Sequence, residues 1–466
     1  MKALIDPDHA LARGLAAIRT DFQVPASFPA PVLAAAEQAA TRAPTEHADR
    51  TALPFVTLDP ATSTDLDQAF HIERAGADIL LHYAIADIAW FVEDGGVIDQ
   101  EAWARGTTLY LPDGKAGLYP KILSEDAASL LPAGPRPAVI FTIRISPDGA
   151  VRLDGAERAI IQSRAKLAYD RVQPADLPEP FADLAKRIQA AEIRRGAVRV
   201  DPPEQQVTHV AGDGYALTFR PRLASEDDNA ALSLACNLAV ADALLAHQTG
   251  LFRVMAAPSD QAVQRLRHTA RAFRLDWPHS MPLKEYERSL SANVPAEAAF
   301  MLAIRRAGQG ASYAPFAPGE TPWHAAMAAT YAHATAPLRR LADRYVVRAA
   351  LAIANGQPVP PVVTEAFASL PPVMARADSQ AGRIDRAVID LAEAVMLQGR
   401  EGEAFPAIVT DTTQGGVRVQ LRDLPVVANL KTNGPSPGDK LALTLVTADT
   451  ARGTIAFAPA TDGLMP

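Results

Sequence analysis

The stretch FVTLDPATSTDLDQAF at residues 55–70 places three carboxylates, Asp59, Asp65 and Asp67, in one short segment. The apolar residues before Asp59 predict the end of a strand that Pro60 stops, so the other two aspartates are expected on the following loop. Such a density of negative charge is best tolerated when a cation neutralises it. Oxygen ligands alone favour magnesium or manganese over zinc. The alternative is a solvated loop whose side chains cap backbone amides.

Five sequence blocks further along the chain favour a catalytic role for the aspartate segment over a solvated loop. They are HYAIADIA at 82–89, TLYLP at 108–112, LSEDAASLL at 123–131, SRAKLAY at 163–169 and YAHATAPLRR at 331–340. Together with the aspartate segment, and in this order, they resemble the signature of the RNB catalytic domain. This is the hydrolytic exoribonuclease domain of the ribonuclease II and ribonuclease R family. The matching blocks extend over most of the chain, from about residue 53 to about residue 391.

The resemblance implies a metal-dependent site at the aspartate segment. Asp59 and Asp65 match metal-binding carboxylates, and Asp67 matches the family aspartate most directly tied to cleavage. Many family members carry a fourth aspartate where this chain has Gln68. The Gln68 amide oxygen can coordinate a cation but brings no charge, so a second metal is expected to bind more weakly. Magnesium is the expected cofactor, with manganese as the alternative, because paired metals activate water and neutralise a leaving oxygen.

The block at 331–340 predicts a phosphate site. Thr335, two residues before Pro337, is predicted to cap a helix, and a helix N-terminus binds phosphate readily. Arg339 and Arg340 would follow in its first turns, where a cation opposes the helix dipole and is better explained by an external anion. The resemblance implies that Arg339 clamps the reacting phosphate. Arg340 is assigned to RNA binding, with pairing to Asp343 as the alternative.

Other side chains have both a functional and a structural interpretation. By resemblance, Tyr169 stacks near the terminal nucleotide and Tyr110 is a second RNA contact; stacking contributes about 1–3 kcal/mol per base and tolerates any base. Core packing is the alternative for both tyrosines. Asp87 is a further acidic candidate, with a turn-capping carboxylate as the equal alternative. His333 is expected to be a hydrogen-bonded packing residue.

Composition limits the class of protein. The 466 residues are 48% hydrophobic and carry a net charge of −8, from 45 basic and 53 acidic residues. This charge argues against nonspecific coating of nucleic acid but allows an internal basic channel. The one cysteine, Cys236, excludes an internal disulfide and is expected to be buried. No run approaches the ~18 apolar residues of a membrane span and no signal-peptide pattern is present, so we expect a cytoplasmic protein without membrane contact.

Three regions are predicted. Residues 1–50 form a small helical segment, with helices at 10–18 and 31–43, which leaves no room for the cold-shock barrels usual in the family and predicts a short form. Residues 51–400 form an α+β RNB catalytic domain, with strands to about 219 and mainly helices from 227. Residues 401–466 contain five short strands separated by glycine turns, which predict a five-stranded OB barrel for RNA binding. A barrel that only supports the core is the alternative.

The resemblance, together with these features, implies a magnesium-dependent 3′-to-5′ exoribonuclease that hydrolyses single-stranded RNA to 5′-mononucleotides, and we expect a monomer. A catalytically impaired RNA-binding protein of the same fold is the alternative from another class, motivated by Gln68. A metal phosphodiesterase acting on small nucleotides is a third hypothesis, which the tyrosines and the barrel argue against.

Overall fold

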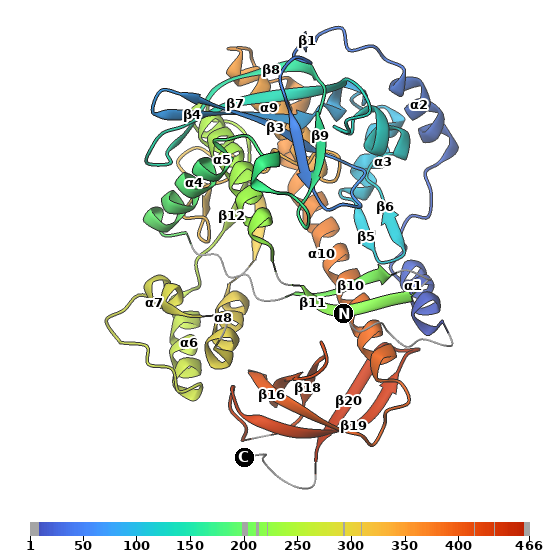
Figure 1. Ribbon diagram of the computed structural model, residues 1–466, viewed down its shortest axis with the longest axis vertical. Coiled ribbons are helices and arrows are strands. Elements are labelled where there is room, and N and C mark those ends of the chain that lie inside the picture. Colours follow the sequence, from blue (N-terminus) through green and yellow to red (C-terminus); the bar gives the residue numbers. More distant parts are fainter. Residues whose placement is uncertain are drawn as a thin grey trace.

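A seven-stranded mixed sheet is the largest part of the fold (Figure 1). The computed structural model describes residues 9–197, 204–210, 214–220, 222–291, 294–308, 310–413, 415–432 and 434–460. The strand order in the sheet is β1-β8-β7-β4-β3-β2-β9, and the two outer pairs, β1 with β8 and β2 with β9, are parallel. The strands are β1 (Ala48–Asp49), β2 (Val56–Asp59), β3 (Gln68–Ala75), β4 (Asp78–Ala86), β7 (Arg136–Ile145), β8 (Val151–Ile161) and β9 (Ala165–Ala168).

Helices pack on this sheet because its central strands bury apolar side chains. In β4, Ile79, Leu81, Tyr83 and Ile85 are all fully buried. The covering helices are α4 (Phe181–Arg195), α5 (Ala224–Ala246) and α9 (Leu341–Ala354), with α2 (Ala30–Ala40) and α3 (Val97–Arg105) packed together at one side. Short 3-10 or π turns lie at Ile88–Trp90, Leu123–Ala127 and Pro174–Asp176. The predicted α+β class is confirmed.

Helix α5 is apolar around most of its circumference. By length and composition alone it could cross a membrane, so the expectation that no segment qualifies is wrong. In the fold, 67% of its most apolar window is buried inside the protein. Cys236, near its middle, is fully buried, as predicted. The helix is therefore the central core helix against which both the sheet and α9 pack.

A second, small sheet leads into a helical lobe. Its order is β13-β12-β14-β15, and the sequence did not predict it. The strands are β12 (Leu251–Met255), β13 (Ala311–Pro315), β14 (Trp323–His324) and β15 (Ala329–Thr330). Between β12 and β13 the chain forms α6 (Asp260–Ala272), α7 (Leu283–Ser289) and α8 (Pro295–Ala307). These three helices, called the helical lobe below, surround their own aromatic cluster of Trp277, Tyr286 and Phe300.

The helix α10 (Pro361–Leu397) connects the sheet region to the C-terminal barrel (Figure 1). Leu11 and Leu15 of α1 (Ala10–Asp21) pack in one apolar cluster with side chains of α10. The hairpin of β10 (Glu204–Val210) and β11 (Gly214–Arg220) also contacts α10. A second hairpin, β5 (Leu109–Leu111) and β6 (Gly114–Ala116), lies nearby. The two predicted N-terminal helices are present as α1 and α2.

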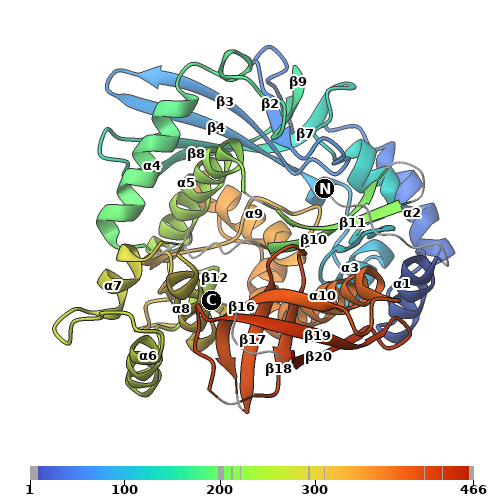
Figure 2. The same ribbon diagram turned by 60° about the horizontal axis from the view of Figure 1, so that its bottom comes forward.

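The five predicted C-terminal strands are confirmed as an antiparallel sheet in the order β18-β17-β16-β19-β20 (Figure 2). They are β16 (Ala404–Thr413), β17 (Gly416–Leu421), β18 (Val427–Leu430), β19 (Lys440–Asp449) and β20 (Thr454–Pro459). The edge strands β18 and β20 contact each other, so the sheet nearly closes into an OB-type barrel with its own apolar core. Gly416 permits the close pairing of β17 with β18, since a Cβ there would lie 2.1 Å from the Leu430 carbonyl oxygen.

Candidate active site

The aspartate loop runs from the end of β2 to the start of β3. Asp59 is the last residue of β2, as predicted, and Gln68 is the first of β3. Lys166 Nζ donates to the carbonyl oxygens of Ala61 (2.9 Å) and Ser63 (2.5 Å). The Ser129 hydroxyl accepts from Leu66 N (2.9 Å) and donates to the Thr64 carbonyl (2.8 Å). Two of the sequence blocks thus supply the side chains that fix the shape of this loop.

Asp67 and Arg339 lie together although 272 positions separate them in the chain. Asp67 Oδ1 accepts a hydrogen bond from Leu338 N (2.7 Å), and Oδ2 lies 3.3 Å from Arg339 Nε. The Asp67 side chain is 5% exposed, whereas that of Arg339 is 43% exposed. The structure therefore places the predicted cleavage aspartate beside the predicted phosphate clamp, with the arginine open to a ligand.

Asp65 receives one donor on each carboxylate oxygen. The Tyr110 hydroxyl donates to Oδ2 (2.9 Å), and Lys115 Nζ lies 2.8 Å from Oδ1. Tyr110 is 49% exposed, so the core-packing alternative for this tyrosine is wrong. Lys115 was missed from the sequence, although a two-residue turn at Pro112-Asp113 would have placed it opposite Tyr110 in a hairpin.

Burial makes ionisation of the Asp59 and Asp67 carboxyl groups unfavourable. Burial raises the pKa of Asp59 to about 7; Arg339 opposes this and Asp65 adds to it. Burial likewise raises the pKa of Asp67 to about 7, against the opposing effects of Arg339 and the Leu338 amide. A cation at this position would offset the cost of ionising these two groups.

The carboxylates of the aspartate loop supply oxygen ligands of the kind that magnesium prefers. Among the residues that the structure describes, no three His, Cys, Asp or Glu side chains are arranged as a complete metal site. Magnesium at phosphate-processing sites is commonly held by one or two carboxylates, with substrate phosphate and waters completing the shell. Within the described part of the chain the Asp59 carboxylate has no hydrogen-bond donor, and it lies close enough to Asp65 and Arg339 for their charges to shift its pKa. Asp59 is thus the carboxylate of this cluster that is open to such an ion, since both oxygens of Asp67 already have partners in Leu338 and Arg339.

Two further acidic-site candidates have protein partners. The Gln68 amide oxygen accepts a hydrogen bond from the Tyr83 hydroxyl, so its role as a metal ligand stays a prediction. Asp87 Oδ2 lies 3.2 Å from His47 Nε2 and 2.9 Å from Arg158 Nε, and Asp87 is 2% exposed. These contacts support a structural role for Asp87.

The prediction that Thr335 caps a helix is wrong, because α9 begins only at Leu341. Residues 337–339 before it form a turn, in which the backbone N–H groups of Arg339 and Arg340 donate to the Ala336 carbonyl. The backbone N–H groups at positions 334, 336 and 338 donate to side-chain oxygens of Asn237, Asp343 and Asp67. Thr335 itself is 2% exposed and shares a 2.9 Å hydrogen bond with Ser233. Its burial does not favour the predicted RNA contact.

The remaining residues of this segment serve the fold. Arg340 makes a bidentate pair with Asp343, at 3.0 and 2.7 Å, which was the alternative to RNA binding. Asp343 is fully buried and so is not available to solvent. His333 Nδ1 lies 2.9 Å from the Tyr313 hydroxyl, and burial lowers the His333 pKa well below its usual value. His333 is thus the hydrogen-bonded packing residue that was expected.

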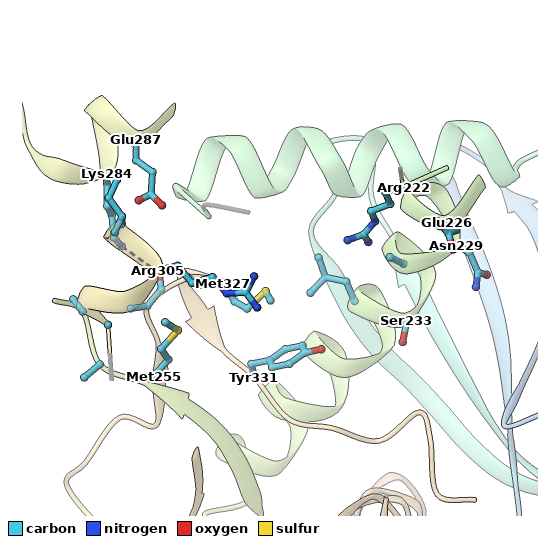
Figure 3. A pocket seen from close by; sticks show the side chains of 18 of the residues that line it. Arg222, Glu226, Asn229, Ser233, Met255, Lys284, Glu287, Arg305, Met327 and Tyr331 are labelled. Carbon is cyan, nitrogen blue, oxygen red and sulfur yellow. Dashed lines mark hydrogen bonds between the residues drawn. The ribbon is translucent and has the colours of Figure 1, made fainter. Parts of the chain in front are cut away.

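A cavity of about 930 Å³ opens beside this site and is bordered by Arg339 and Tyr169. The Tyr169 hydroxyl accepts a 2.9 Å hydrogen bond from Asn229 Nδ2, which also bonds to the Leu58 carbonyl. Figure 3 shows Lys284, Glu287 and Arg305 of the helical lobe on one side, and Arg222, Glu226 and Asn229 on the other.

The cavity is basic although the chain as a whole is acidic. Its lining includes five basic side chains against two acidic ones: Arg220, Arg222, Lys284, Arg305 and Arg339 against Glu226 and Glu287. Apart from Arg339, these basic residues were not identified from the sequence, because they come from segments that only the fold brings together. A polyanion is the class of ligand that this lining favours.

Family models and known proteins are similar to this chain in sequence. The RNB domain matches residues 47–355, and the RNase II-type exonuclease C-terminal S1 domain matches residues 403–460. Ribonuclease R of Aquifex aeolicus is 25% identical over 443 residues, which cover 88% of this chain and 62% of that protein.

Solved structures show the same fold. RNase R of Mycoplasma genitalium, solved with ribose-methylated single-stranded RNA, has a TM-score of 0.86 at 21% identity and covers 97% of this chain and 78% of its own. Yeast Ssd1, described as a pseudonuclease, has a TM-score of 0.67 at 15% identity and covers 94% of this chain and 57% of its own. The fold alone therefore does not decide whether a protein cleaves RNA.

The chain spans about half to three fifths of the length of the first curated relatives that it matches. The RNB match alone covers more than half of this chain, and the S1 match coincides with the C-terminal barrel. The chain therefore belongs to the RNB family of ribonuclease II and ribonuclease R, as its sequence blocks indicated.

Proposed function

We propose that this chain is a 3′-to-5′ exoribonuclease that degrades single-stranded RNA to 5′-mononucleotides and depends on magnesium. The observation that carries the proposal is the position of Asp67 and Arg339 at a large basic cavity. Family membership supports the reaction and its direction. We also propose that the protein acts in the cytoplasm, as a monomer.

In this proposal each side chain has a distinct task. Arg339, half exposed, holds the reacting phosphate and remains oriented by its ion pair with Asp67. Tyr169 and Tyr110 offer aromatic faces for bases near the strand end. Magnesium, when bound, makes water more acidic and neutralises the leaving oxygen. Asp59 would hold this ion, and manganese could take the place of magnesium.

The remaining basic residues of the cavity hold the rest of the strand. Arg222 lies on one wall and Lys284 and Arg305 on the other (Figure 3), so a single strand between them is contacted on both sides. These contacts are to phosphates and carry no sequence information, which suits an enzyme that consumes every sequence. Binding is therefore expected to weaken steeply with salt.

The test is an assay of the purified chain with a 5′-labelled, unstructured RNA. Magnesium should give progressively shorter labelled species, and EDTA should stop the reaction. A DNA strand of the same sequence serves as the matched substrate control. Cleavage that starts at internal positions, or that continues unchanged in EDTA, would contradict the proposal.

The second candidate is an RNA-binding protein that has lost turnover. Gln68 supplies no charge where many relatives carry an aspartate, and Lys115 already neutralises Asp65. RNA binding without hydrolysis across a range of magnesium and manganese concentrations would select this candidate.

A further inference from the structure

Lys115 lies in the acidic site through the geometry of one hairpin. Strands β5 and β6 pair Tyr110 directly opposite Lys115. The Tyr110 hydroxyl and the Lys115 ammonium then bind the two oxygens of the same carboxylate, Asp65, at 2.9 and 2.8 Å. Both oxygens of Asp65 are therefore occupied by protein groups.

The Lys115 ammonium has a full set of acceptors. Besides Asp65, its Nζ lies 3.3 Å from Glu125 Oε1 and 3.2 Å from Thr64 Oγ1. Thr64 in turn donates to Glu125 Oε2 at 3.0 Å, which closes the network. An ammonium has three donors, so the three acceptors satisfy it completely. The Lys115 side chain is only 19% exposed.

The hairpin is fixed from outside the site. Arg19 of α1 donates to both oxygens of Asp113 in the hairpin turn, at 2.9 and 2.7 Å, and to the Gly114 carbonyl at 3.1 Å. Lys115 follows this turn directly. A lysine on an anchored hairpin is a fixed positive charge rather than a mobile surface side chain.

A fixed ammonium between two carboxylates does electrostatically what a bound cation does. We propose that Lys115 is a built-in cation that occupies the Asp65–Glu125 pair, so that this chain binds one divalent ion, with Asp59 as its open carboxylate, instead of two. Gln68 is neutral and adds no negative charge to the site, so it also disfavours binding of a second ion. The inference rests on the proposed metal-dependent function, but it concerns ion binding and is tested without hydrolysis.

The test counts Mn²⁺ ions bound per chain by electron paramagnetic resonance, in the absence of RNA. The wild type should bind one ion. Lys115→Met leaves Asp65 and Glu125 without their cation and should bind one additional ion, or bind the second at least tenfold more tightly. Lys115→Arg keeps the charge and should behave as the wild type. Lys121→Met is the matched control, because Lys121 is an exposed lysine only six residues further along the chain.

Each outcome decides the matter. Two ions on the wild type, or no extra ion on Lys115→Met, would overturn the proposal. Lys115→Gln repeats the test if the methionine variant does not fold; if neither folds, the wild-type count alone decides between one ion and two. A wild type that binds no ion would overturn the expected count of one ion and contradict metal-dependent hydrolysis as well, whereas two ions on the wild type would overturn only the role of Lys115.

Discussion

At the scale of single residues, Asp67 connects two distant segments. One of its oxygens accepts the Leu338 amide and the other pairs with Arg339, so it fixes the aspartate loop against the segment that carries the arginine. The charge of Asp67 can be removed while one hydrogen-bond acceptor is kept, because an asparagine side chain is neutral and retains a carbonyl oxygen.

Asp67→Asn should therefore retain RNA binding and lose turnover by about 10²–10³-fold, as expected when a charge acting at the transition state is removed. Single-turnover rates measure the loss, and fluorescence anisotropy of labelled RNA in EDTA measures binding. Arg171→Met, at an exposed arginine outside the site, is the control. Turnover near that of the wild type in Asp67→Asn would transfer the role to another carboxylate.

The sequence predicted the residues of the site better than their partners. Asp59, Asp65 and Asp67 are adjacent in the chain, so local reasoning could group them. Lys115 and the basic cavity residues were missed because they join the site only through hairpin register and through the packing of the helical lobe. Residue-by-residue roles at the site, including those of Gln68 and Tyr169, stay predictions.

At the scale of elements, α1 positions the β5–β6 hairpin. The Arg19–Asp113 pair is bidentate and only about a quarter exposed on each side. A bidentate, partly buried ion pair contributes more to folding stability than a typical surface pair does, and we expect a contribution of about 1 kcal/mol here. Because Tyr110 and Lys115 lie on this hairpin, we expect α1 to fix their positions.

Arg19→Met should loosen the hairpin, raise hydrogen exchange at the Leu111 and Ala116 amides, and lower the rate of hydrolysis about three- to tenfold. Arg13→Met, on an exposed position of the same helix, is the control. In a double-mutant cycle the effects of Arg19→Met and Asp113→Asn should not add, since both break one pair. Additive effects would show that α1 acts by another route.

The element that sequence reasoning assigned wrongly is the segment 331–340. Pro337 and Thr335 are typical of a helix start, and local preferences favour that interpretation. The fold instead satisfies alternate amides of this segment with side chains of Asn237, Asp67 and Asp343. Asn237 and Asp67 lie far away in the chain, so their contribution is invisible to local pattern analysis.

At the scale of the whole molecule, the sheet region, the helical lobe and the barrel each have a separate apolar core. Helix α10 joins the sheet region to the barrel, and it contacts β13, the strand that follows the lobe in the chain. Polar contacts join the three units. Arg306 of the lobe pairs with Asp411 of the barrel. Glu393 of α10 accepts from Val427 N of the barrel (2.8 Å) and from Gln205 of the β10–β11 hairpin (2.6 Å), both on Oε1.

Glu393 makes this junction sensitive to pH. Burial raises the Glu393 pKa to about 7, against the opposing effects of its two hydrogen bonds. Because the folded state holds this proton more tightly than the unfolded state, the stabilisation is complete below about pH 4.5 and is lost as pH rises through about 7. The neutral Glu393→Gln side chain keeps the acceptor that receives both bonds.

Glu393→Gln should thus match the wild type near pH 4 and exceed its unfolding free energy by about 1–3 kcal/mol at pH 8. Urea unfolding at the two pH values measures the difference. Glu401→Gln, at an exposed position beyond the same helix, is the control. An equal difference at both pH values would assign the effect to packing instead of ionisation.

The burial of Cys236 makes the chain suitable for labelling introduced cysteines with fluorescent dyes. It is the one cysteine of the sequence, it is fully buried in α5, and burial raises the pKa of its thiol. Thiol reagents need an accessible thiolate, so the native fold should stay unlabelled. Cysteines introduced at the exposed positions Gln264 on the lobe and Val446 on the barrel would accept a pair of dyes selectively. Energy transfer between them would follow, in real time, whether the two units separate when a strand enters.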